Sequence, residues 1–151
     1  MKVIPGLVIA LVMIATDSTA QIRRGGGGGG AKVEETTNII NECERKTNSF
    51  KKTLDRALGR DNVRAGEGRE EQLNANASRL ENQFDKIGDS WNKDHDMNKT
   101  RGHVQAALVL GNDINKAMRN WNMGGDAESE WNTLRAGLNR LATNFGLPHI
   151  R

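Results

Sequence analysis

Four stretches of this sequence carry apolar residues at spacings of three and four, the period of an amphipathic α-helix. They cover residues 33–58, 67–92, 100–121 and 127–145. No segment alternates apolar and polar residues for long enough to predict a strand. Short polar loops join the stretches, and short connections favour antiparallel neighbours. The pattern therefore predicts an all-α fold, an up-down-up-down four-helix bundle over residues 33–148.

Each predicted helix has one apolar stripe that we expect to face the core. The stripes contain Ile40, Cys43, Thr47, Phe50, Leu54 and Ala57; Leu73, Ala77, Leu80, Phe84, Ile87 and Trp91; Val104, Ala107, Leu108, Gly111, Ile114, Met118 and Trp121; and Trp131, Leu134, Leu138, Leu141 and Phe145. The first stripe holds several small or polar side chains. We therefore expect the first helix to be the least stable element and to leave apolar surface exposed for another chain.

Several residues mark the predicted helix ends. Gly59 and Gly146 are typical C-terminal stops, because glycine enters the left-handed region without a Cβ penalty. Asp126 is a candidate N-cap of the fourth helix, and Asn98 or Thr100 of the third. Gly111, inside the third stripe, predicts a close approach of a neighbouring helix, because a glycine there otherwise costs about 1 kcal/mol.

The first 20 residues resemble a secretory signal peptide. Lys2 provides the positive end, residues 3–15 form a mostly apolar run, and residues 18–20 put small side chains at the cleavage site. The run is shorter than the ~20 apolar residues of a membrane span. We therefore expect a secreted or periplasmic protein without stable membrane insertion after cleavage; the alternative is a membrane anchor formed by an uncleaved signal segment.

Residues 21–32 are predicted to be a flexible leader, because they contain the glycine run 25–30. A phosphate-binding loop of the Walker type would end in Gly-Lys-Ser or Gly-Lys-Thr, whereas Gly30 is followed by Ala31, Lys32 and Val33. The glycine run therefore predicts a linker and no nucleotide site.

Cys43 is the only cysteine, so no internal disulfide can form. Its position on the first stripe favours a small buried side chain. The alternative is a reactive thiol or an intermolecular disulfide.

Two tryptophans, Trp121 and Trp131, are predicted to lie at one end of the bundle and Trp91 at the other. They are expected to close the core, or alternatively to anchor a partner through Trp121 and Trp131.

The segment around His95 is the main candidate for a metal site. Asp94, Asp96 and Asn98 have the spacing of an EF-hand loop, but Lys99 replaces its glycine and Gln105 its final glutamate. These differences argue against calcium. His95, Asp96 and His103 stay weak candidates for a transition metal. We expect no cofactor, because haem and di-iron motifs do not occur.

Other function classes find little support. The formal net charge is +3, of which Arg23 and Arg24 supply two, and acidic and basic residues are otherwise interleaved, which argues against nucleic-acid binding. No Gly-x-Ser-x-Gly motif occurs, and we expect no enzyme activity. Two glycosylation sequons begin at Asn76 and Asn98, and neither is treated as a site because chance matches are frequent in an Asn-rich chain.

We therefore expect an exported, non-enzymatic protein of structural or interaction type. A protein partner or a second copy would bind through the first helix or the Trp121/Trp131 end. The alternative is an exported bundle that binds a ligand or a metal.

Overall fold

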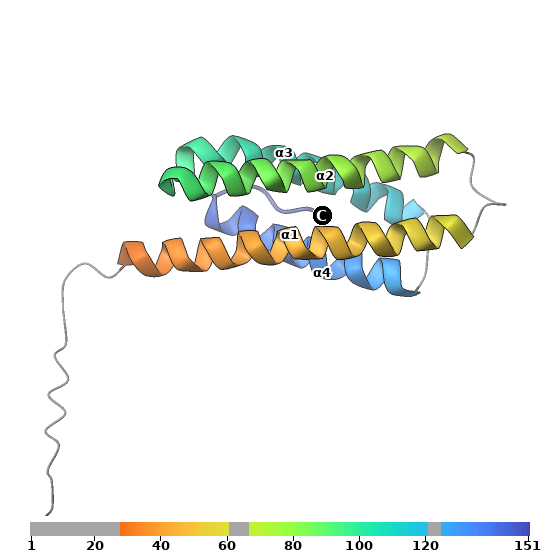
Figure 1. Cartoon of the computed structure of the whole chain (residues 1–151), viewed down its shortest axis with the longest axis horizontal. Helices are drawn as coiled ribbons and strands as arrows, with labels where there is room; N and C mark the ends of the chain where they lie inside the picture. Colours follow the sequence, from red (N-terminus) through yellow and green to blue (C-terminus); the bar gives the residue numbers. More distant parts are fainter. Residues whose placement is uncertain (1–27, 61–66, 121–124) are drawn as a thin grey trace, which may run out of the picture.

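The computed structural model describes residues 28–60, 67–120 and 125–151. These residues form four α-helices and no strand, as the apolar pattern predicts. The helices are α1 (Gly28–Arg60), α2 (Glu67–Asp94), α3 (Met97–Asn120) and α4 (Gly125–Asn144). Each runs antiparallel to the one before it, which gives the up-down-up-down order (Figure 1). Among the described residues, no helix is long and apolar enough to cross a membrane.

The helices form a closed ring of neighbours. α1 packs against α2 and α4, and α3 packs against α2 and α4, whereas the diagonal pairs make no comparable contact among the described residues. The apolar stripes fill the space between the helices. Phe50, Leu80, Phe84, Ile114 and Leu134 are among the large side chains that this core removes completely from solvent. Burial of each such side chain stabilises the fold by about 1.5–3 kcal/mol.

α1 contributes more to the core than its predicted stripe suggests. Ile39 and Leu58 are buried in addition to the stripe, and buried Thr36 extends the packed face toward the N-terminus. This wider face packs against both neighbours of α1, the helices α2 and α4. The expected thin, partly exposed apolar face of α1 is therefore wrong. In the described part of the chain, the only exposed large apolar side chain is Val109, on α3.

The boundary between leader and bundle also differs from the prediction. α1 begins at Gly28, so residues 28–32 of the predicted leader are helical. The side chains of α1 pack against the core only from about Val33 onward. The helix extends further toward the N-terminus because backbone hydrogen bonds can add turns once a helix is nucleated. The predicted signal peptide lies outside the described residues, as does most of the leader.

The chain after α4 belongs to the bundle, which therefore extends beyond residue 148. Gly146, at φ 60°, ends the helix as predicted: its N–H donates to the carbonyl of Thr143 at 3.2 Å, and Leu147 donates to Ala142 at 2.8 Å. The segment then runs back along the bundle between α3 and α4 (Figure 1). Ile150 is buried there. Sequence periodicity cannot detect this segment because it is not helical.

Two hydrogen bonds join Ile150 of this segment to Asn139 of α4. The backbone N–H of Ile150 donates to Asn139 Oδ1 at 2.8 Å, and the Asn139 amide donates to the carbonyl of Ile150 at 3.3 Å. From α3, Asn115 donates to the carbonyl of Arg151. The segment thus bridges α3 and α4, whose direct packing is less extensive than that of the other neighbours.

The candidate N-caps of α3 and α4 lie inside their helices. Asp96 caps α3, because its Oδ1 accepts the backbone N–H of Asn98 at 2.8 Å and of Lys99 at 3.3 Å. Thr100 is buried inside the helix, where its hydroxyl lies 3.0 Å from that of Ser90. Asp126 lies in the first turn of α4, which begins at Gly125. A carboxylate there is favoured by the helix dipole even though it does not cap.

Candidate functional site

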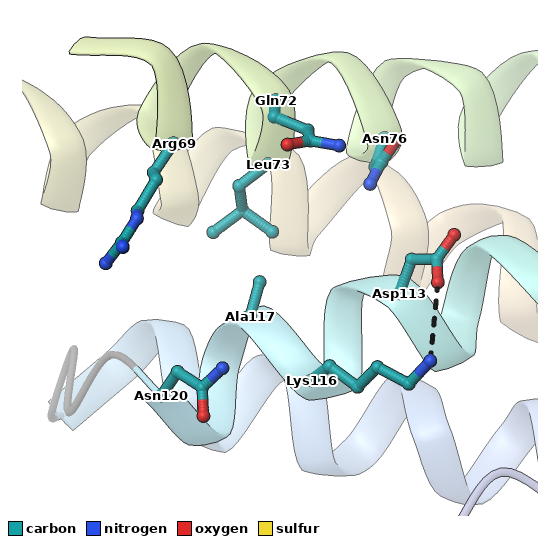
Figure 2. Close-up of a pocket in the computed structure, with 8 residues that line it drawn as sticks. All are labelled: Arg69, Gln72, Leu73, Asn76, Asp113, Lys116, Ala117 and Asn120. Atoms are coloured by element: carbon teal, nitrogen blue, oxygen red, sulfur yellow. Dashed lines mark ion pairs between the residues drawn. The ribbon is translucent and has the colours of Figure 1, made fainter. Parts of the chain in front are cut away.

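A pocket of about 520 Å³ lies between α2 and α3. Four residues of α2 and four of α3 line it, and Figure 2 shows the two sets facing each other across it: Arg69, Gln72, Leu73 and Asn76 on α2, and Asp113, Lys116, Ala117 and Asn120 on α3. The volume falls within the range of small-molecule sites. We treat this pocket as the candidate binding site.

The sequence places these residues on matching helix edges. On each helix they recur at spacings of three and four, so they form one row beside the apolar stripe. Leu73 is buried, and Ala117 packs partly against the core, so the two form an apolar floor. The remaining lining groups are amides and charged side chains. This combination of an apolar floor and convergent polar groups is typical of small-ligand sites.

Asn76 is the residue that distinguishes this pocket. It is only 7% exposed, yet its side-chain amide makes no hydrogen bond to any described residue. In the described part of the chain, every fully enclosed side-chain nitrogen and oxygen has a hydrogen-bond partner. The Asn76 amide has no such partner, so it is not fully enclosed and stays open to the pocket. Figure 2 shows the amide pointing from α2 into the space above α3. The amide is therefore one of the few parts of this side chain that a molecule in the pocket can reach, and it offers both a donor and an acceptor.

The charged groups of the pocket are two cations and one anion. Lys116 Nζ lies 3.9 Å from Asp113 Oδ1, at the limit of an ion pair, and both side chains are well exposed. Arg69 makes no ion pair with a described residue. The lining therefore carries one net positive charge.

Another hollow, of about 650 Å³, lies on α4. All its lining residues come from α4, and all are exposed. It contains no buried polar group that could fix the orientation of a ligand.

The predicted metal candidates are held by protein hydrogen bonds. His95, at φ 54°, caps the end of α2: its ring stacks on Trp91 at 5.3 Å, and its Nδ1 lies 2.7 Å from the Trp91 carbonyl. Asp96 caps α3. His103 is bonded to Gln83 of α2, with Nδ1 3.3 Å from the amide nitrogen. Among the described residues, no group of three or more His, Cys, Asp or Glu side chains is arranged to hold a metal.

The segment compared with an EF-hand is not a loop over its whole length, because α3 begins at Met97. Lys99 forms an ion pair with Asp94, and this contact lowers the pKa of the Asp94 carboxyl. The carboxylates of Asp94 and Asp96 are therefore engaged by the protein itself.

Cys43 lies inside the bundle and is fully buried. A Cβ built on Gly137 of α4 would lie 2.9 Å from its Sγ, so Gly137 allows α1 and α4 to approach closely here. Burial raises the pKa of the thiol to about 12. A disulfide with another chain would require the bundle to open, because the sulfur has no access to solvent.

Trp131 is part of the core. It is 2% exposed, its ring lies 5.3 Å from that of Phe50, and its indole N–H donates to Asn115 Oδ1 at 3.0 Å. Trp91 lies toward the opposite end of the bundle and donates to Thr37 at 2.9 Å. Trp121, the other proposed anchor, lies outside the described residues. The interaction roles of Cys43, Trp121 and Trp131 stay predictions.

None of the pocket residues is a functional candidate from the sequence alone. In the sequence, Asn76 belongs only to a glycosylation sequon. Its burial, and its lack of a hydrogen-bond partner among the described residues, are known only from the structure. The available signal was the matching rows of polar residues beside two apolar stripes, but such rows also occur on solvated helix faces.

Comparisons of the chain with protein-family models, with curated proteins and with solved structures find no match.

Proposed function

We propose that this chain is an exported, non-enzymatic binding protein that holds a small ligand in the α2–α3 pocket. One observation carries the proposal: the amide of Asn76 is nearly buried, faces the pocket and has no partner among the described residues. A ligand in the pocket could accept a hydrogen bond from this amide and donate one to it.

A non-catalytic role is supported by the chemistry of the lining. The eight lining residues include no histidine, cysteine, serine or threonine, so the pocket offers no hydroxyl or thiol nucleophile with an imidazole base beside it. Cys43, the most nucleophilic type of side chain in the sequence, is buried and has a raised pKa that keeps it a thiol. Export is supported by the sequence pattern of residues 1–20.

The described surface favours a pocket over an apolar docking face. Val109 is the only large apolar side chain exposed in the described ranges, at 57%, and a single exposed side chain is ordinary for a soluble domain. Binding of a protein partner or a second copy through α1, one of the two surfaces expected from the sequence, would need apolar side chains that the structure buries.

A thermal-shift screen with a fragment library tests the proposal. Fragments that bind the folded protein raise its melting temperature, by an amount equivalent to about 2.7 kcal/mol at a hundred times Kd. The screen is repeated with Asn76→Leu, which removes the amide, and with Asn92→Leu, which makes the same change at an exposed position of α2.

We expect some fragments to raise the melting temperature of the native protein and of Asn92→Leu, and to leave that of Asn76→Leu unchanged. The proposal fails if no fragment stabilises the native protein, or if Asn76→Leu responds as strongly as Asn92→Leu.

A further inference from the structure

We infer that the ligand of the α2–α3 pocket is a small organic carboxylate that carries an apolar group. This inference rests on the proposed binding function and specifies the chemistry of the ligand. Three features of the pocket support it: its net charge, its apolar floor and the position of Asn76.

The charge of the pocket favours an anion. Arg69 and Lys116 come from different helices, and Asp113 offsets only one of them. An arginine side chain offers paired N–H donors that match the two oxygens of a carboxylate. Arg69 is available for such a contact because it has no ion pair with a described residue. A cationic ligand would instead meet two like charges and a single carboxylate.

The charges of the pocket do not come from the ends of its helices. The pocket spans the start of α2 and the end of α3, which are antiparallel, so the positive end of one helix dipole lies beside the negative end of the other. The two fields oppose each other. The preference for an anion therefore depends on the side chains, and their substitution tests it.

The floor and Asn76 define the rest of the ligand. Leu73 and Ala117 face each other across the pocket and offer an apolar contact (Figure 2). The amide of Asn76 lies beside them and provides both a donor and an acceptor. A ligand that satisfies all three features has a carboxylate, a short hydrocarbon part and one further polar group, as an N-acylated amino acid does.

The test uses pairs of compounds that differ in one group. N-acetylleucine is compared with N-acetylleucinamide, which replaces the carboxylate with a neutral amide, and with leucinamide, which carries an amine. A fragment library in which every carboxylic acid is accompanied by its primary amide extends the comparison. Affinities are measured by protein-observed NMR titration of the native protein.

Three variants identify the groups responsible. Arg69→Gln and Lys116→Gln each remove one cation from the pocket, and Asn76→Asp adds a negative charge with almost no change in shape. Arg79→Gln is the matched control, because Arg79 is an exposed residue of α2 that does not line the pocket. It makes the same change in net charge elsewhere on the same helix.

We expect the acids to bind about tenfold more tightly than their amides. Arg69→Gln and Lys116→Gln should each weaken acid binding by roughly threefold to fivefold, a size set by the exposure of both cations. Asn76→Asp should weaken acid binding by at least about tenfold, whereas Arg79→Gln should leave it unchanged.

The outcomes separate the two proposals. If amides or amines bind as tightly as acids, and their binding depends on Asn76, the carboxylate assignment is wrong while the binding function stands. If Arg79→Gln weakens acid binding as much as Arg69→Gln, the preference reflects overall charge and the assignment is again wrong. If no compound binds in a way that depends on Asn76, both proposals fail.

Discussion

Gly111 makes room for Ile150: a Cβ built on this glycine would lie 2.5 Å from Cδ1 of the isoleucine. Gly111 belongs to α3, and Ile150 to the segment that follows α4. The close approach predicted for this glycine therefore exists, but its partner is the C-terminal segment. Leu138 of α4 completes the contact, 3.3 Å from the same Cβ position. The bundle is thus closed between α3 and α4 partly by chain that is not helical.

Substitution of Gly111 tests this closure. Gly111→Ala places a methyl group against Ile150, and overpacking of this kind costs about 1–3 kcal/mol. Gly102→Ala is the matched control, because it lies on the same helix with nothing within 4 Å of its Cβ position. We expect Gly111→Ala to be less stable than Gly102→Ala by about 1–3 kcal/mol in urea unfolding. Equal stability of the two variants would show that Ile150 does not pack there.

Asn115 connects the core to the same segment. It accepts the indole N–H of Trp131 at 3.0 Å and donates to the carbonyl of Arg151. Asn115→Ala leaves a buried N–H without a partner, and we expect it to lower the free energy of unfolding by about 2 kcal/mol. Asn132→Ala, at an exposed position of α4, should change it by less than about 0.5 kcal/mol. A loss no larger than that of Asn132→Ala would argue against this network.

The thiol of Cys43 makes stability depend on pH in the alkaline range. Its pKa rises from an ordinary value of 9.0 to about 12 in the folded protein, mainly because burial disfavours the thiolate. The unfolded chain therefore loses its proton first. The stabilising effect is complete below pH 9.0 and is lost as the pH rises toward 12, by up to about 1.4 kcal/mol per pH unit.

Urea unfolding at several alkaline pH values measures this effect. Lysine side chains also titrate there, so Cys43→Ala serves as the reference: the native protein should lose stability more steeply with pH than this variant. Parallel pH profiles would mean that the thiol is solvated in the folded state.

Asn76→Leu should increase stability. It replaces a nearly buried amide that has no partner among the described residues with an apolar side chain beside Leu73 and the core. We expect a gain of about 1 kcal/mol in the free energy of unfolding, whereas Asn92→Leu should have no comparable effect. A residue that reduces stability but serves binding is a common trade-off in natural proteins. A loss of stability in Asn76→Leu would indicate that the amide has a structural role.

Much of the fold could be predicted because hydrophobic periodicity reports which side of a helix faces the core. Every stripe residue of α2 is buried, from Leu73 to Trp91, and α4 behaves in the same way from Trp131 to Phe145. The same signal underestimated α1. Adjacent Ile39 and Ile40 are both buried, so the packed face of α1 is wider than the single line of residues that the spacing selects.

The rest of the structure depends on contacts between distant parts of the chain. Burial of Ile150 depends on the gap at Gly111, and no local pattern connects these residues. The start of α1 within the glycine run shows how far hydrogen bonding extends past the packed stripe. The pocket could not be predicted from the sequence. The side chains that α3 places opposite Asn76 decide whether its amide has a partner, and the local pattern of α2 does not report them.

The NMR signals of the Asn76 side chain test the binding proposal most directly. Its amide N–H resonances can be assigned from their disappearance in Asn76→Leu and followed in a ¹⁵N-labelled sample while N-acetylleucine is added. We predict that they shift along a saturating curve, together with the backbone signals of Leu73 and Ala117. Signals of Asn76 that stay in place up to saturating ligand would contradict the account.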